Sequence, residues 1–387
     1  MFELVDFNQG AKIKVVGLGG AGGNAVNNMI ESGLTGVEFV VCNTDLQDLE
    51  KSKSPTKIQI GSETTRGLGT GANPELGRRA AEENLDRVRQ ALEGADMVFI
   101  AAGLGGGTGT GAAPVVSDVA KEQGCLTVAV VTKPFTFEGR PRKKVAEGGL
   151  KELKGRVDTI ITIPNDRLLA AGSKNALALD MFKQADDVLL QAVKGIADLI
   201  NVTGTVNVDF NDVRRVMAEK GLALMGTGMA SGANRAVEAA TRAISNPLLE
   251  DVSIGGARGV LLNITAGPDL SMTDVQDAAT VIQKEADSEA EVIFGMVIDP
   301  RMEDNLMVTV IATGIGPRDG INTAPDMRVI KQEAINELKR RSREDLDWPT
   351  YLRDQIKPEE DSRQPLGREK LDQTDHEIPT FLRRAAD

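Results

Sequence analysis

Runs of apolar, β-branched residues recur along the first half of the chain, and longer segments with polar positions separate them. Five of these runs are expected to be strands: 12–17, 37–43, 96–102, 126–132 and 158–163. A strand that is apolar at nearly every position is covered on both faces, so these runs predict a parallel sheet with helices on either side. Helical patterns at 74–92 and 114–123 fit that arrangement. The first half is predicted to be a doubly wound α/β domain, with ligands at the carboxyl ends of its strands.

A longer helical pattern follows at 177–202, where apolar residues recur at spacings of three and four. It predicts a central helix that joins the first domain to a smaller one at 203–316. The elements expected in the smaller domain are helix 233–245, strand 259–264, helix 273–287, and strands 291–298 and 306–313. Because the last two strands follow each other without a helix, they predict a hairpin within the mixed sheet of an α+β domain.

The two ends of the chain differ from the middle. Residues 1–10 are expected to be a flexible N-terminus, ahead of a domain that spans 11–176. Charged residues and prolines dominate 317–375 without a sustained strand pattern, which predicts a disordered linker. Residues 376–387 regain apolar character beside two arginines. An apolar and basic segment at the end of a tether is typical of a docking peptide, and the alternative is a frayed tail.

The charge of the chain restricts its partners. The formal net charge is −12, which argues against nucleic acid or an anionic membrane surface as the main partner. No run approaches the ~18 apolar residues of a membrane span, and the N-terminus has no signal-peptide layout, so we expect a cytoplasmic protein without direct membrane insertion. Cys42 and Cys125 adjoin apolar runs and are expected to be buried free thiols. The only histidine, His376, lies near the end of the chain, which excludes histidine catalysis in the folded domains.

The most informative motif follows the strand at 96–102. Residues 103–111 read Gly-Leu-Gly-Gly-Gly-Thr-Gly-Thr-Gly, which leaves almost no side-chain bulk above that strand. Such a loop lets backbone N–H groups converge on phosphate oxygens, and the threonines add hydroxyl donors. The helix expected after Pro114 would direct its N-terminal dipole at the same place. The segment is therefore predicted to bind a polyphosphate.

A second glycine motif follows the first strand. Gly17 to Gly22 matches G-x-G-x-x-G, with a helix expected to start near Gly23 and Asn24 and an acidic residue, Asp45, further on. Alone, this motif fits either a dinucleotide-binding turn or a merely tight strand-to-helix turn. Two glycine-rich turns can enclose a longer phosphate chain from both sides. The Walker A pattern does not occur in the sequence, which excludes a P-loop enzyme.

Three further segments have both a structural and a functional interpretation. The glycine-rich stretch 67–74 is either a loop that a phosphate orders or a surface turn. Asp209 and Asp212 precede a helical pattern, where they would cap the helix or would form an acidic face that orients a metal ion or an attacking water. The basic cluster 138–144 is either solvated or, through Arg142, in contact with a ribose or phosphate.

Together these motifs resemble the tubulin superfamily and, within it, the FtsZ family of bacterial cell-division GTPases. The resemblance is carried by 105–111, Asn43-Thr-Asp45, 69–74, Asn207-Val-Asp209-Phe and the terminal 378–383. It covers about residues 10–316 and the last dozen residues. The resemblance implies GTP or GDP as the ligand, Mg²⁺ to offset the phosphate charge, and assembly of the chain with itself into head-to-tail filaments at the midcell division ring.

The resemblance also assigns individual residues. The nucleotide-binding residues that it implies are Gly20, Ala21, Gly22, Gly23, Asn24, Asp45, Ala72, Gly106, Gly107, Thr108, Gly109, Glu138, Arg142, Asn165, Phe182 and Asp186. The glycine segments would hold the phosphates, Ala72 would sense the γ-phosphate, and Glu138 and Arg142 would contact the ribose or a nearby phosphate. Guanine would face Asn165, Phe182 and either Asp186 or Asp187, since this chain has Asp-Asp where family members often have Asn-Asp.

The catalytic residues implied are Asp209, Asp212 and Asn207, acting on the nucleotide of the next subunit. The segment 376–387 would bind membrane-tethering and regulatory division proteins. Two alternatives stay open on the residues alone. One is a nicotinamide-dependent oxidoreductase, based on G-x-G-x-x-G and Asp45, and the other is a relative that binds nucleotide without turnover.

Overall fold

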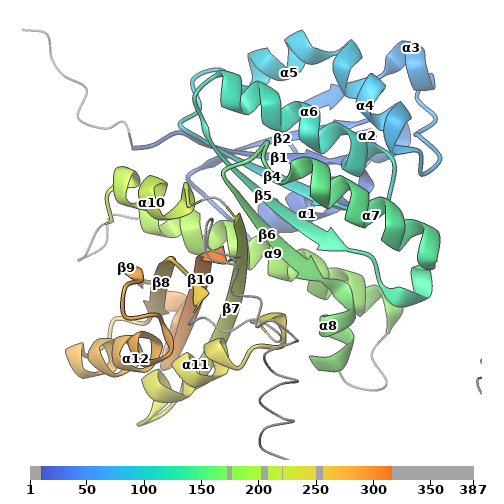
Figure 1. The fold of residues 1–387 in the computed structure, drawn as a ribbon. Helices are drawn as coiled ribbons and strands as arrows, with labels where there is room; N and C mark the ends of the chain where they lie inside the picture. Colours follow the sequence, from blue (N-terminus) through green and yellow to red (C-terminus); the bar gives the residue numbers. More distant parts are fainter. Residues whose placement is uncertain (1–9, 172–176, 202–207, 220, 250–255, 316–387) are drawn as a thin grey trace, which may run out of the picture. The chain divides into compact units, whose positions relative to one another are not determined.

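The computed structural model describes residues 10–171, 177–201, 208–219, 221–249 and 256–315. The predicted linker 317–375 and the segment 376–387 lie outside these residues. The described strands form one ten-stranded sheet in the order β3-β2-β1-β4-β5-β6-β7-β10-β8-β9 (Figure 1). Among the described residues, no helix combines the length and the apolarity that a bilayer crossing needs.

Six parallel strands build the first half of the sheet, and five of them correspond to the predicted apolar runs. They are β1 (Ile13–Leu18), β2 (Val37–Asn43), β3 (Thr56–Gln59), β4 (Met97–Gly103), β5 (Leu126–Lys133) and β6 (Thr159–Pro164). Their helices are α1 (Gly19–Glu31), α2 (Leu46–Lys51), α3 (Ser62–Thr65), α4 (Pro74–Glu83), α5 (Leu85–Leu92), α6 (Thr108–Glu122), α7 (Arg140–Leu153), α8 (Asn165–Ala171) and α9 (Ala178–Asn201). The sequence did not predict β3, and the helix expected at 74–92 is two helices that meet at Asn84.

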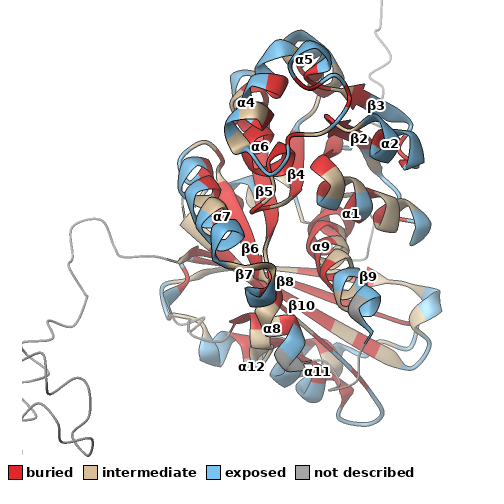
Figure 2. Ribbon diagram, turned by 90° about the vertical axis from the view of Figure 1, so that its right-hand side faces the viewer, coloured by how far each residue is buried: buried red, intermediate tan, exposed pale blue. Residues whose placement is uncertain are grey.

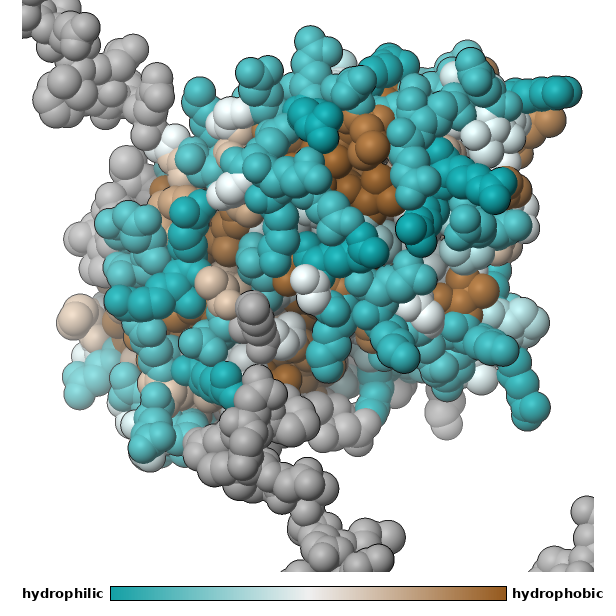
Figure 3. All heavy atoms as spheres, turned by 45° about the horizontal axis from the view of Figure 1, so that its top comes forward, coloured by the Kyte–Doolittle hydropathy of each residue, from teal (hydrophilic) through white to brown (hydrophobic). Residues whose placement is uncertain are grey.

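Helices cover both faces of this parallel sheet. Successive residues of β4 point to opposite sides, so that Phe99 packs with α1 and α9 in one apolar cluster while Val98 packs with α4, α5 and α6 in another. Buried residues therefore run along the strands, and exposed positions gather on the outer sides of the helices (Figure 2). The face of the molecule in Figure 3 is largely hydrophilic, with apolar atoms in separate patches. The doubly wound prediction is confirmed.

The second half of the sheet is mixed, as predicted. It contains β7 (Gly221–Ser231), β8 (Gly259–Ala266), β9 (Glu291–Ile298) and β10 (Asn305–Ile315), with α10 (Phe210–Met217), α11 (Arg235–Ile244) and α12 (Met272–Glu285). The expected hairpin of 291–298 with 306–313 is wrong. Strand β10 pairs antiparallel with β7 and β8, whereas β9 pairs parallel with β8 at the edge. The burial pattern explains this order, because β10 is buried at most positions and takes a central place, while β9 alternates.

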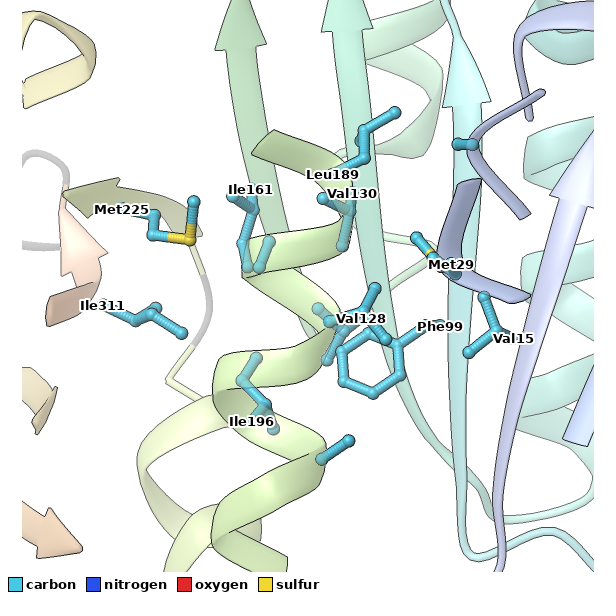
Figure 4. Packing of buried hydrophobic residues seen from close by; sticks show 14 of the residues in the cluster. Val15, Met29, Phe99, Val128, Val130, Ile161, Leu189, Ile196, Met225 and Ile311 are labelled. Atoms are coloured by element: carbon cyan, nitrogen blue, oxygen red, sulfur yellow. The ribbon is translucent and has the colours of Figure 1, made fainter. Parts of the chain in front are cut away.

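The two halves of the sheet meet where β6 and β7 pair in parallel over only three residue pairs, from Thr159 with Gly221 to Ile161 with Ala223. The helix α9 lies across this junction and packs against both halves. Its residues Leu189 and Ile196 share one cluster with Phe99 on one side and Ile311 on the other (Figure 4). The domain boundaries at 176 and 203 stay a prediction. Cys42 and Cys125 are buried free thiols, as expected, and burial raises the pKa of Cys42 to about 12.

Candidate functional site

A cavity of about 340 Å³ lies at the carboxyl ends of β1, β4 and β5. This volume is within the range of small-molecule sites. The residues that line the cavity are Leu18, Gly19, Gly20, Ala21, Asn24, Thr70, Gly103, Leu104, Gly106, Gly107, Thr108, Gly109, Thr132, Pro134, Glu138, Arg142, Asn165, Phe182, Ala185 and Asp186. The position agrees with the rule for parallel α/β sheets.

The first glycine motif forms the turn from β1 into α1. This helix begins at Gly19 rather than near Gly23 and Asn24, because Gly19 has φ +67° and turns the chain sharply into the helix. Residues of its first turn therefore line the cavity, where their N–H groups have no partner within the helix. Gly22 has a packing role, since a Cβ on it would lie 2.3 Å from the Ala101 oxygen.

The second glycine motif contains the start of a helix rather than only a loop. Helix α6 begins at Thr108, so the expectation of a helix that starts after Pro114 is wrong. Close packing against α4 and the loop before it explains the glycines, since a Cβ on Gly107 would lie 2.2 Å from Thr70 Oγ1 and one on Gly111 would lie 2.0 Å from the Pro74 oxygen. Gly106 differs, because its Cβ would meet no protein atom within 4 Å. Its missing side chain leaves space in the cavity.

The two glycine motifs touch each other. A Cβ on Gly19 would lie 2.9 Å from the Gly109 nitrogen, and one on Gly109 would lie 3.1 Å from the Leu18 oxygen. The N-terminal ends of α1 and α6 therefore face the same cavity. Each helix N-terminus carries partial positive charge and free N–H donors, so two of them at one place favour an anion with several oxygens.

Charged and aromatic side chains form the wall beside these glycines. Glu138 accepts a hydrogen bond of 2.5 Å from Arg142 and a second, of 2.9 Å, from the backbone N–H of Phe135. The ring of Phe182 meets the edge of Phe135 at 5.3 Å between centroids. Asn165 is buried, and among the described residues its side-chain oxygen has no hydrogen-bond partner. An orphaned acceptor in a cavity wall suits a ligand with N–H or O–H donors.

The structure distinguishes the two adjacent aspartates on α9. Asp186 lines the cavity, while Asp187 accepts a hydrogen bond of 2.9 Å from Asn28 of α1. Burial raises the pKa of Asp186 to about 7, and the nearby charge of Asp187 adds to the shift. Asp186 is therefore placed to accept hydrogen bonds from a ligand once it is ionised.

Twelve of the predicted nucleotide-binding residues line the cavity, and four do not. The four are Gly22, Gly23, Asp45 and Ala72. Asp45 caps α2 by accepting from the N–H groups of Gln47 and Asp48. Ala72 lies in the loop before α4 with φ +61°, a left-handed conformation that is unusual for alanine. Direct contact of these four with a nucleotide stays a prediction.

The predicted catalytic residues are not brought to the cavity of their own chain. Asp209 accepts from the N–H of Asn211 and so caps α10, and Asp212 pairs with Arg215 at 3.4 Å rather than completing a capping box. Neither lines the cavity. Asn207 lies outside the described residues.

Sequence reasoning missed several residues of the cavity wall. Thr132 is the last residue of the strand predicted at 126–132 and Pro134 follows it, so the rule that ligands bind at strand ends would have found them. Thr70 lies within the recognised 67–74 stretch, but the sequence gives no sign that its side chain points inward. Ala185 lines the cavity because of the rotation of α9 about its own axis, and the spacing of apolar residues along the sequence does not determine this rotation.

Comparisons with known proteins identify the family of the chain. The model of the Tubulin/FtsZ family, GTPase domain, matches residues 12–173, and that of the FtsZ family, C-terminal domain, matches 221–316. The cell division protein FtsZ of Coxiella burnetii is 52% identical over 388 residues, which covers 99% of each chain. That of Pseudomonas aeruginosa is 51% identical over 396 residues and covers 100% of each chain.

Two solved structures are also similar. An empty FtsZ dimer from M. jannaschii has a TM-score of 0.77 and 44% identity, and the match covers 81% of this chain and 90% of that one. CetZ2 from Haloferax volcanii, in a GTPγS-bound protofilament, has a TM-score of 0.69 at 22% identity over 85% and 99% of the two chains, so it shares the fold. Both family models belong to one GTPase family, which leaves the oxidoreductase alternative without support. The chain belongs to the FtsZ family of tubulin-like cell-division GTPases.

Proposed function

We propose that the cavity binds GTP, that the chain assembles head-to-tail into filaments of the bacterial division ring, and that GTP is hydrolysed at the contact between two subunits. The observation that carries this proposal is the separation of two sets of groups. Most of the residues predicted to bind the nucleotide line one cavity, while Asp209 and Asp212 lie outside its wall, at the start of α10, with exposed or half-exposed side chains. Carboxylates on that surface are free to meet the nucleotide of a second copy.

Exposed apolar side chains near the cavity support a subunit contact there. Leu68 is 84% exposed and adjoins the loop of Thr70, Phe137 is 67% exposed and precedes Glu138, and Leu179 is 81% exposed one helical turn before Phe182. Clustered apolar exposure of this kind is typical of interaction surfaces. The FtsZ relative from M. jannaschii is a dimer, which also supports self-association. A contact that repeats without closing produces an open filament.

Mg²⁺ fits this site as an ion held mainly by the nucleotide. Among the described residues there is no group of three or more side chains suited to hold a metal. Mg²⁺ usually takes one or two carboxylates together with phosphate oxygens and water. The Asp48 carboxylate lies beside the first glycine turn, 3.4 Å from where a Cβ on Gly20 would stand, and could supply such an oxygen. When bound, the ion would offset the phosphate charge.

The dependence of turnover on protein concentration tests the shared site. Phosphate release per molecule is expected to rise steeply above a threshold concentration and to be almost absent below it, because a lone subunit has only half of the catalytic groups. Sedimentation with GTP and with GDP should show the same threshold for assembly with GTP. A constant rate per molecule across dilution would contradict the proposal, and binding of GTP without release at any concentration would favour a relative that lacks turnover.

The affinity for GTP is expected to fall as the pH is lowered below about 7. Guanine presents N–H donors at N1 and N2, which require the ionised form of Asp186. Below its pKa this carboxyl carries a proton that must be lost on binding, so the affinity should drop by up to about tenfold for each pH unit. Titration calorimetry between pH 5.5 and 8.5 would measure the change.

Asp186→Asn is the matched control for this pH effect, because it keeps the shape of the side chain without its titration. Phosphate groups also titrate near pH 6, so the quantity to follow is the ratio of the two affinities. We expect the variant to bind GTP more weakly at pH 8 and the difference from wild type to shrink as the pH falls. A ratio that does not change with pH would show that Asp186 does not read the base.

We further propose that residues 376–387 bind membrane-tethering and regulatory division proteins. The support is the apolar and basic sequence at the end of a charged linker, and these residues lie outside the described ones. Deleting 376–387 is expected to leave sedimentation with GTP intact and to abolish recovery of division proteins from a bacterial lysate. Deleting 350–361, a linker segment of equal length, serves as the control. Failed assembly of the first deletion would contradict this assignment.

A further inference from the structure

Three threonine hydroxyls meet behind the second glycine motif. Thr108 Oγ1 lies 2.7 Å from Thr44 Oγ1 and 3.2 Å from Thr70 Oγ1. The three residues come from separate segments: the end of β2, the loop before α4, and the first residue of α6. All three are buried. Thr70 and Thr108 line the cavity, whereas Thr44 lies behind them.

The number of protons in this cluster does not match the number of contacts. Each hydroxyl has one proton to donate and two lone pairs to accept with. The three hydroxyls therefore carry three protons, but only two hydrogen bonds join them. Within the part of the chain that the structure describes, these three hydroxyls have no other hydrogen-bond partner. One proton is left over, and a further acceptor would use it.

Because Thr70 and Thr108 both line the cavity, an acceptor there resolves the mismatch in one of two ways, and every proton of the cluster is then used once. If Thr108 donates its proton to an oxygen in the cavity, its two lone pairs accept the protons of Thr44 and Thr70. If Thr70 donates to that oxygen instead, Thr108 donates to Thr70 and accepts the proton of Thr44. Thr44 donates to Thr108 in both arrangements. Donation from neighbouring hydroxyls also polarises the Thr108 hydroxyl, which strengthens its bond to a charged oxygen.

We propose that Thr44 is a positioning residue that acts through Thr108 on the phosphate chain of the nucleotide. This inference rests on the proposed binding of a guanine nucleotide in the cavity. The side chain of Thr44 is buried and does not line the cavity, so a direct contact with the ligand does not account for any effect that it has.

The cluster also links the phosphate to the 67–74 stretch. Gly69, Gly71 and Ala72 of this loop are all in the left-handed region, and Ala72 is strained there. The hydroxyl of Thr70 ties the loop to Thr108. An anion in the cavity fixes the direction of this bond: Thr70 is the donor when Thr108 donates to the anion, and the acceptor when Thr70 itself donates to the anion.

The test compares Thr44→Val with Thr44→Ser in the full chain. Valine replaces the hydroxyl with a methyl group of similar size, while serine keeps the hydroxyl. Titration calorimetry with GDP and with guanosine separates the phosphate chain from the base and ribose. We expect Thr44→Val to weaken GDP binding roughly tenfold, the effect of one hydrogen bond to a charged group, and Thr44→Ser to stay close to wild type. Affinity for guanosine should be the same in all three proteins.

Two results would overturn the inference: wild-type GDP affinity in Thr44→Val, or an equal loss for guanosine. Urea unfolding without nucleotide shows whether each variant folds. If Thr44→Val does not fold, Thr44→Ala replaces it in the same assay, because alanine and serine at this position differ only by the hydroxyl, and the same difference from Thr44→Ser is expected. Absence of GDP binding in the wild-type chain would instead overturn the proposed function, so the two failures can be told apart.

Discussion

Asp212→Ala is expected to bind GTP as tightly as the wild type and to lose turnover by at least about 100-fold, the usual contribution of a positioned carboxylate. Binding should persist because Asp212 does not line the cavity of its own chain. Folding should persist because the substitution removes only a partly exposed ion pair with Arg215, and such pairs contribute little to stability. Calorimetry and phosphate release measure the two effects.

Arg215→Ala is the matched control for this substitution. It breaks the same ion pair from the other side, together with the pair of Arg215 and Glu291, and keeps the carboxylate of Asp212. We expect this variant to retain most of its turnover. Normal hydrolysis in Asp212→Ala, or an equal loss in Arg215→Ala, would show that the carboxylate does not take part in the reaction.

Gly106→Val is expected to weaken GTP binding by at least about 100-fold, or ~2.7 kcal/mol, with little change in the free energy of unfolding. A Cβ at this position would meet no protein atom within 4 Å, so the added methyl groups would occupy space in the cavity and not in the protein core. Gly107→Ala should differ from it by lowering the stability of the fold. Its Cβ would lie 2.2 Å from Thr70 Oγ1, so overpacking should lower the free energy of unfolding by about 1–3 kcal/mol.

Urea unfolding without nucleotide and calorimetry with GTP would separate these two neighbouring glycines. Equal losses of stability in both variants would show that Gly106 serves packing and not the ligand.

Gly106→Val also provides a complementation test. In a mixture of the two variants, the Gly106→Val chain supplies the carboxylate of Asp212, and the Asp212→Ala chain supplies an intact cavity. Turnover should reappear in the mixture, and a mixture without activity would place the whole catalytic site within one chain.

The sequence was sufficient to predict the elements that depend only on the pattern of neighbouring residues. The strand at 96–102 is recognisable because each position from Met97 to Ala102 is apolar, and the glycine motif after it indicates a phosphate site because few other structures need that composition. Pairing is different, since it depends on residues far apart in the chain. The pattern at 306–313 indicates a strand. Its position between β7 and β8, however, depends on which strands of the whole sheet become buried, and the predicted hairpin was therefore wrong.

Within the site, tertiary packing overrode local propensity. Glycine is a poor helix former, so the first turn of α6 was interpreted as loop, yet close contact with the loop before α4 requires glycine there. The choice between Asp186 and Asp187 depends on the rotation of α9, where adjacent residues point about 100° apart. The threonine cluster was not predictable, because Thr44, Thr70 and Thr108 are far apart in the chain and only the folded sheet brings their hydroxyls together.

The short junction between β6 and β7 has a consequence for how the chain melts. Three residue pairs supply few hydrogen bonds, so most of the attraction between the two halves comes from apolar surface buried against α9. Phe99 and Met225 belong to opposite halves but to the same cluster around Ile196, so neither half has a complete interior without the other. The regions 12–173 and 221–316, although they match separate family models, are therefore expected to lose their structure in a single cooperative thermal transition.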